Sequence, residues 1–271
     1  MIEIFKLSIL FTLGIIASLI VFGLLIGYIE RKSNSLIYGS LGKGGIIFTG
    51  IIGTTVHEFS HFIMCKLFLH KVTDVKWFSL NINNGGELGY VRHSYNLKSI
   101  YQRIGNFFIG VAPVLIGTFI LIIAYKFLMR DSFNEFIKTI NFKNYLEIGK
   151  DFSIINFLNY IILEFKNILG SLFTLQNIKT LNFWIFMLVA TSVSTHMSLS
   201  KADLKNSLDG IGFIFLFSVI LGILFFIFKV SFSKAVTIVC VFNIIIISFL
   251  SIGLLFSFIT FLIVKLISFC L

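Results

Sequence analysis

The chain has 271 residues, of which 57% are hydrophobic and only 13% are charged, and its mean hydropathy is +1.00. Soluble domains carry about 25% charged residues, so this composition excludes an ordinary soluble protein and predicts a multi-pass integral protein of the cell membrane. The net charge of +10 does not indicate nucleic-acid binding, because the basic residues are dispersed among loops and form no basic helix or stripe.

Two apolar runs begin the chain, from about Leu7 to Tyr28 and from about Ile46 to Leu69. Each is long enough for a membrane-spanning helix, which needs roughly 20 apolar residues. The first run has no cleavage site after it, so we expect a retained helix. A polar, glycine-rich link over residues 30–45 separates the two runs.

A connector of mixed character follows over residues 71–103. Strand-like pieces at Val72–Leu80 and Leu88–Val91 flank Asn83–Gly86, which is a turn signal. We therefore expect a small β-hairpin directly after the second apolar run.

The third apolar run extends from about Ile104 to Leu128, and Pro113 is expected to kink it. Small residues let membrane helices approach closely, and this run is rich in them: Gly105, Gly110, Ala112 and Gly117. The next segment, Arg130–Thr180, is not a clean span. Its apolar residues recur at helical spacing from Phe152 to Leu172, which predicts an amphipathic helix in the membrane interface. A seventh span broken by Glu164 is the less favoured interpretation.

Three further apolar runs complete the chain. The fourth starts near Leu181 and is followed by a polar stretch over residues 191–203. The fifth covers about Gly210 to Val230, and the last covers Ala235 to Leu271. We therefore expect one all-α membrane domain over residues 1–271 with about six membrane-spanning helices.

The chemistry is predicted by His57-Glu58-Phe59-Ser60-His61 in the second apolar run. Residues four apart lie on one helix face, so both imidazoles can bind one zinc ion, and we expect one such ion per chain. Glu58 can take a proton from an attacking water molecule. Three ionisable groups within a span cost several kcal/mol unless they are paired or coordinated, which argues against coincidence.

A catalytic zinc needs a third protein ligand. Cys65 continues the i, i+4 series, but it lies about 12 Å beyond His57, too far to share one ion. We expect Cys65 to be a small apolar helix residue, and His70 and His93 to be solvated.

The polar end of the fourth run offers His196, Asp203 and Asp209. Such polarity is tolerated at membrane depth only where it is buried in protein or lines a cavity. We favour Asp203 as the third ligand. Asp209 abuts the next span, where capping a helix is its simpler task, and His196 could instead support a ligand or contact substrate.

On these residues the chain resembles the site-2 protease family of intramembrane zinc metalloproteases. The resemblance extends to the Gly85–Val91 stretch, to Gly110-Val111-Ala112-Pro113 and to the late aspartate. It implies a metalloprotease core over about residues 46–210, with accessory helices at 7–28 and 210–271.

The third ligand departs from the family pattern, which is an Asp-Gly pair in a proline-rich segment. Asp209-Gly210 is that pair literally, but it lacks the prolines. A serine-rich stretch leading into an aspartate fills this place in divergent relatives, and residues 198–203 resemble that version.

The resemblance implies cleavage of membrane-protein or membrane-peptide substrates in or near their spanning segments, and the expected hairpin could hold the unwound substrate by adding a strand. Two other functions are compatible with the composition. A transporter would also use mid-membrane charges and broken helices, but no internal repeat supports it. A non-catalytic pseudoprotease would bind membrane partners, but an intact Glu58 argues against it.

Overall fold

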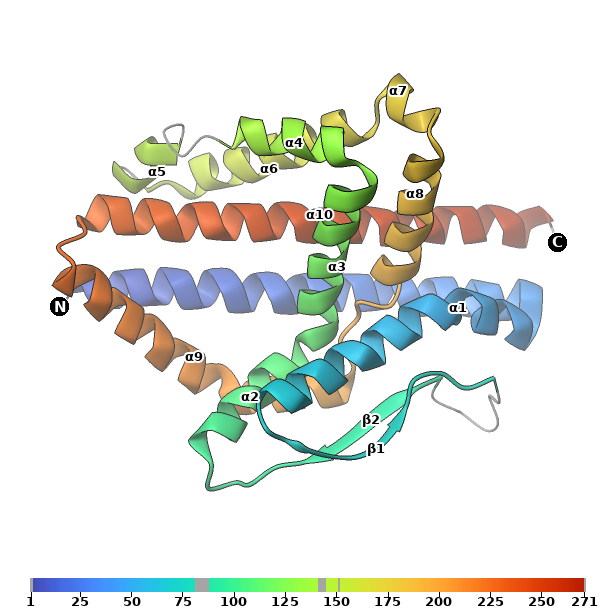
Figure 1. Ribbon diagram of the computed structural model, residues 1–271, viewed down its shortest axis with the longest axis horizontal. Coiled ribbons are helices and arrows are strands. Elements are labelled where there is room, and N and C mark those ends of the chain that lie inside the picture. Colours follow the sequence, from blue (N-terminus) through green and yellow to red (C-terminus); the bar gives the residue numbers. More distant parts are fainter. Residues whose placement is uncertain (1, 81–87, 141–144, 151, 271) are drawn as a thin grey trace. The chain divides into compact units, whose positions relative to one another are not determined.

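The computed structural model describes residues 2–80, 88–140, 145–150 and 152–270. Most of these residues are helical, and two short strands form the rest of the regular structure (Figure 1). The elements in chain order are α1 Ile2–Leu67, β1 Lys71–Lys76, β2 Tyr90–Ser94, α2 Ile100–Gly110, α3 Ala112–Leu128, α4 Arg130–Thr139, α5 Leu146–Lys150, α6 Ile154–Leu172, α7 Leu175–Ile178, α8 Leu181–Ser194, α9 Lys201–Ile227 and α10 Phe232–Cys270.

The chain divides into two compact units, each assembled from three separate stretches. The first unit contains residues 1–18, 122–186 and 212–252, and the second contains residues 19–121, 187–211 and 253–271. All of the candidate ligands and Glu58 belong to the second unit.

Helix α1 contains both of the first two expected runs. It has 66 residues and is interrupted at Gly42, whose φ of 62° and ψ of −156° are not helical. Only glycine adopts this backbone region readily. The chain doubles back there, giving two helical arms (Figure 1). The polar link expected over residues 30–45 contains this reversal, but its backbone is helical on both sides of Gly42.

The expected β-hairpin is present as an antiparallel pair of strands, β1 and β2. Lys76 pairs with Tyr90 and Lys71 with Ser94, and the register shifts near Thr73. The strands are displaced from the expected bounds, because β1 ends at Lys76 and β2 continues to Ser94. The expected turn at Asn83–Gly86 lies outside the described residues.

The third expected span is a bent pair of helices. Helices α2 and α3 meet at Val111 with an angle of 63°, which confirms the kink expected from Pro113. The small residues serve close packing, as expected: a Cβ atom on Gly110 would lie 2.3 Å from the carbonyl oxygen of Asp203. Helix α9 therefore approaches α2 at a distance that only glycine permits.

The first unit contains the four helices α4 to α7, which occupy the segment Arg130–Thr180 that was expected not to be a clean span. Its long helix, α6, confirms the expected helix, while a location in the membrane interface stays a prediction. Glu164 on α6 is 2% exposed and accepts a hydrogen bond from the Tyr145 hydroxyl. The apolar core of this unit contains Tyr145, which precedes α5, together with Ile148 of α5 and Val239 of α10.

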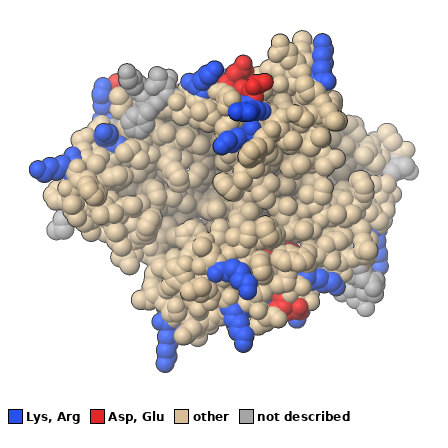
Figure 2. Space-filling model, in the orientation of Figure 1, with Lys and Arg blue, Asp and Glu red and all other residues tan. Residues whose placement is uncertain are grey.

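Three helices among the described residues are long and apolar enough to cross a membrane: α1, α9 and α10. The bent pair α2–α3 would be a fourth if it counts as one span, and α8 is a shorter apolar helix. Most of the surface seen in Figure 2 carries no charged side chain. These features are those of a mainly helical membrane protein. Six crossings would require each arm of α1, the bent pair and α8 to be counted as spans as well as α9 and α10.

Candidate metal centre

His57 and His61 lie one turn apart on the second arm of α1, and their rings meet edge to face, with 65° between planes. Their Nε2 atoms are 3.2 Å apart and their ring centroids are 4.9 Å apart. Two nitrogen ligands of one tetrahedral zinc ion, each about 2.0–2.1 Å from the metal, would be separated by about 3.3 Å. The pair is therefore spaced as two ligands of one ion would be.

Both rings are oriented by backbone carbonyl groups. The Nδ1 atom of His57 lies 2.7 Å from the carbonyl oxygen of His196, and Nδ1 of His61 lies 2.9 Å from that of Ile109. A carbonyl oxygen only accepts hydrogen bonds, so each Nδ1 carries the proton. In neutral rings both Nε2 atoms then present lone pairs to each other, an arrangement that repels unless a cation lies between them.

The two carbonyl groups can accept from the rings because each lies at an interruption of a helix. Pro113 has no N–H and cannot make the i to i−4 bond to Ile109. Helix α8 ends at Ser194, so the carbonyl of His196 is not part of its helical hydrogen-bond pattern. The helix breaks thus supply the acceptors that fix both imidazoles.

Asp203 completes the group from the first turn of α9. Its Oδ1 atom lies 3.5 Å from Nε2 of His61. One ligand atom from each of His57, His61 and Asp203 lies within 4.8 Å of the others. Asp203 is buried, with 7% of its surface exposed, so its carboxylate needs a partner of opposite charge.

A local structural role also holds Asp203 in place. The backbone N–H of Ser200 donates to Oδ2 of Asp203 at 2.8 Å, and the backbone N–H of Asp203 donates to the Ser200 hydroxyl at 3.1 Å. This reciprocal pair is a capping box at the start of α9. The cap uses one carboxylate oxygen and leaves Oδ1 directed at the histidines.

The two alternatives for the third ligand have other partners. Asp209 accepts from Arg103 at 3.1 Å and from Asn106 at 2.8 Å, and it is absent from the candidate metal groups among the described residues. The ring of His196 contacts Thr195 and the carbonyl of Ser192. The geometry therefore brings the carboxylate of Asp203, and the side chain of neither alternative, to the histidine pair. The role of Asp203 as a ligand stays a prediction.

His196 supports the site through its backbone instead of its ring. The ring packs against Gly53, one turn before His57, where a Cβ atom would lie 2.1 Å from Nδ1 of His196. This close contact places the carbonyl of His196 beside His57. From the sequence we expect that His196 could support a ligand, and its carbonyl contact with His57 is a contact of that kind.

Glu58 is 8% exposed and lines a cavity of about 180 Å³ together with His57 and His196. A Cβ atom on Gly89 would lie 2.7 Å from Cγ of Glu58, so the segment leading into β2 lies directly against this side chain. Two further polar residues of α1, Glu30 and Asn34, line the same cavity. Sequence reasoning missed them, because both lie in the polar stretch over residues 30–45 that was interpreted as a link between two apolar runs.

The expectation that His70 is solvated is wrong. Its residue exposure is 4%, and His93 is half-buried. Burial lowers the pKa of both imidazoles, and for His93 the neighbouring His70 adds to the effect. Both rings are therefore neutral at neutral pH.

Two imidazoles and a carboxylate are a donor set that zinc accepts, as in catalytic sites with two histidines and one acidic residue. The candidate centre formed by His57, His61 and Asp203 fits that metal in donor type, in spacing and in the orientation of both rings. Comparison of the chain with protein-family models, with curated proteins and with solved structures found no match.

Proposed function

We propose that this protein is an intramembrane zinc metalloprotease, which hydrolyses peptide bonds of membrane-embedded substrates in or near their spanning segments. The observation that carries the proposal is the convergence of His57, His61 and Asp203 beside Glu58. In this proposal the three residues hold the zinc ion. When bound, the ion would polarise the substrate carbonyl and activate water.

Glu58 is the general base of the proposed reaction. It is adjacent in sequence to His57 and borders the cavity, so it can take a proton from the attacking water and deliver it to the leaving amine. A cavity needs only about 10–15 Å³ of internal space to admit one water molecule, and the cavity of about 180 Å³ exceeds that requirement. Its volume admits water together with part of a substrate chain.

The sheet is the proposed docking edge for an unwound substrate. Gly89, next to β2, would place a Cβ atom 2.9 Å from the carbonyl oxygens of Lys76 and Trp77 as well as 2.7 Å from Glu58. Backbone of the connector therefore lies close to the general base. A peptide that paired with such an edge would have its own backbone extended, which exposes the scissile bond.

The proposal also includes six membrane crossings in the cell membrane. The two arms of α1, the α2–α3 pair, α8 with the residues after it, α9 and α10 would supply them. Helix α8 has 14 residues, or about 21 Å of helix, so the non-helical residues 195–200 would complete its crossing. The lipid bilayer is the expected surrounding of all six.

The test compares the wild-type protein with Glu58→Gln. Membranes of cells that express each form would be analysed for new protein termini, and the purified proteins for zinc. We expect termini within or beside apolar segments only with the wild type, and equal zinc in both proteins. Glu147→Gln, at an exposed ion pair with Lys150 on α5, is the matched control and should cleave normally.

The proposal fails if Glu58→Gln produces the same termini as the wild type. Cleavage that continues in the His57→Ala/His61→Ala double variant would equally exclude it.

A further inference from the structure

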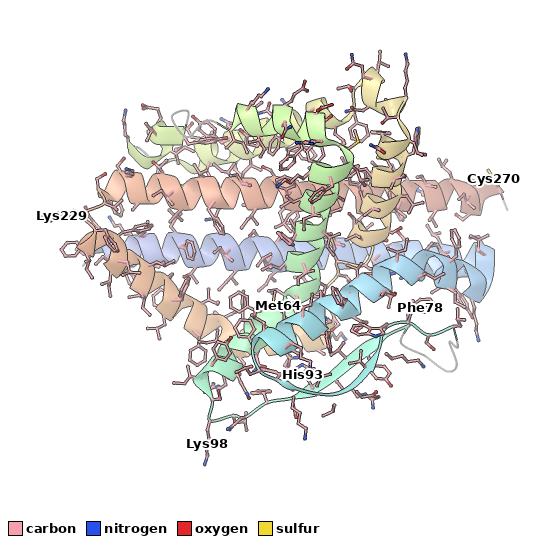
Figure 3. All side chains as sticks on the ribbon, in the orientation of Figure 1. Met64, Phe78, His93, Lys98, Lys229 and Cys270 are labelled. Atoms are coloured by element: carbon pink, nitrogen blue, oxygen red, sulfur yellow. The ribbon has the colours of Figure 1, made fainter. Side chains whose placement is uncertain are left out.

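A second group of metal-type side chains lies in the same unit, outside the proposed catalytic centre. Cys65 is on the last turn of α1, His70 follows that helix and His93 is on β2. One ligand atom from each of these three residues lies within 4.8 Å of the other two. Figure 3 shows Met64, the neighbour of Cys65 on α1, and His93 on β2.

We infer that Cys65, His70 and His93 form a second zinc site, which joins the end of α1 to the sheet. This site goes beyond the proposed protease activity and does not depend on it. One thiolate and two imidazoles are a donor set that zinc, a borderline-soft ion, accepts. Binding would release the thiol proton of Cys65 to solvent.

His70 is already held as a metal ligand would be. Its Nε2 atom lies 2.8 Å from the carbonyl oxygen of Gln102, so Nε2 carries the proton and Nδ1 carries the lone pair. The ring is stacked on Tyr95, with 5.1 Å between centroids and 19° between planes. Its lone pair is directed at Nδ1 of His93, which is 3.0 Å away.

A hydrogen bond from Nδ1 of His93 to Nδ1 of His70 would also account for the distance between the two rings. The sulfur atom of Cys65 beside them is what favours a metal. Cys65 is completely buried and packs with Phe68, Ile109 and Ala112. Packing alone explains a small apolar residue at this position. It does not explain why two imidazoles each place a ring nitrogen within 4.8 Å of the thiol sulfur.

The second ion would be separate from the catalytic one. Cys65 follows His61 by one helical turn, or about 6 Å along the axis, whereas paired catalytic metals lie about 3.5–4 Å apart. The inferred ion therefore has a structural task. By tying β2 to the end of α1 it would fix Gly89, the residue before β2, against Glu58.

Cobalt substitution tests the inference, because the proposed catalytic centre contains no sulfur. A thiolate bound to Co²⁺ gives an intense near-ultraviolet charge-transfer band, and histidine and carboxylate ligands do not. The measurement uses the full-length Cys240→Ser/Cys270→Ser variant, in which Cys65 is the one remaining thiol. We expect the band in this protein and about two metal ions per chain.

Variants separate the second site from the first. The band should disappear in Cys65→Ser and in His93→Ala, and metal content should fall to about one ion per chain. It should persist in His57→Ala/His61→Ala, which removes the other ion. If the band persists in that double variant and the wild type shows no proteolysis, the second site is supported and only the proposed protease activity is rejected.

The inference is overturned if the cobalt-loaded protein with Cys65 intact shows no thiolate band, an outcome that needs no substitution at the site. A band that survives Cys65→Ser would overturn it as well.

Discussion

The Nδ1 atom of His61 lies 2.9 Å from the carbonyl oxygen of Ile109, at the point where α2 ends. Pro113 leaves that carbonyl without the helical N–H it would otherwise accept from. The proline that bends the α2–α3 pair therefore also orients a ligand of the candidate zinc site. A metal-binding histidine with its second nitrogen held in this way keeps one tautomer and one ring direction.

Pro113→Ala should weaken zinc binding without removing any ligand. The substituted residue would supply an N–H that competes with His61 for the Ile109 carbonyl, and loss of such a supporting bond typically costs about 10–100-fold in metal affinity. Competition with a chelator of known affinity measures the change. Phe119→Ala, at an exposed position of the same helix, should leave affinity unaltered. Equal affinity in Pro113→Ala and the wild type would show that Ile109 does not control His61.

Gly89→Ala should reduce cleavage while zinc stays bound. The added Cβ atom would lie 2.7 Å from Cγ of Glu58 and 2.9 Å from two backbone carbonyl oxygens. Backbone cannot move as cheaply as a side chain, so Glu58 is expected to be displaced, and a misplaced base costs up to about 100-fold in rate. Turnover and zinc content are measured together. Gly44→Ala, where nothing lies within 4 Å, is the matched control, and a normal rate in Gly89→Ala would refute the contact's importance.

Gly42→Ala should destabilise the protein, because the φ of 62° and ψ of −156° are essentially restricted to glycine. The expected loss is about 1–3 kcal/mol of unfolding free energy, measured by denaturant titration in detergent. Gly44→Ala, on the helical side of the same reversal, should instead gain about 0.5–1 kcal/mol. Equal stability of the two variants would mean that the reversal moves elsewhere in the chain.

The histidine pair could be predicted from the sequence because its geometry is local: a spacing of four residues on one helix determines it. The approach of Asp203 could not, since it depends on how closely α9 packs against Gly110. Ser200 and Asp203 do carry a local signal, because a serine followed three residues later by an acid predicts a helix start. That signal predicts that Asp203 lies in the first turn of a helix, but it does not predict that the helix starts beside the two histidines.

Burial was the other property that local patterns did not show. His70 lies in a polar connector, yet a carbonyl of α2 and the ring of Tyr95 enclose it. The residues flanking Gly42 are polar and glycine-rich, which favours a loop, but the chain reverses at a single residue. At His70, contacts from distant segments override the local preference. At Gly42 the reversal depends on the backbone freedom of glycine itself, because a Cβ atom there would meet nothing within 4 Å.

Asp203→Ala and Asp209→Ala together decide the third ligand. Asp203 directs Oδ1 at His61, so its removal should deprive the ion of a ligand and lower zinc affinity by at least about 10–100-fold, the loss expected for a supporting residue alone. Asp209 is held by Arg103 and Asn106, and its removal should leave affinity near that of the wild type. Zinc affinity is measured by chelator competition, with folding checked by thermal unfolding in detergent.

Asp203→Asn separates the capping role from the metal role. The asparagine amide oxygen can still accept the Ser200 N–H and cap α9, so the fold should survive, but a neutral amide is a poor zinc ligand. We therefore expect Asp203→Asn to lose zinc at nearly normal stability. A large loss confined to Asp209→Ala would instead assign the third position to the Asp-Gly pair. Loss in neither alanine variant would exclude both carboxylates, and His196→Ala would then be the next variant to measure.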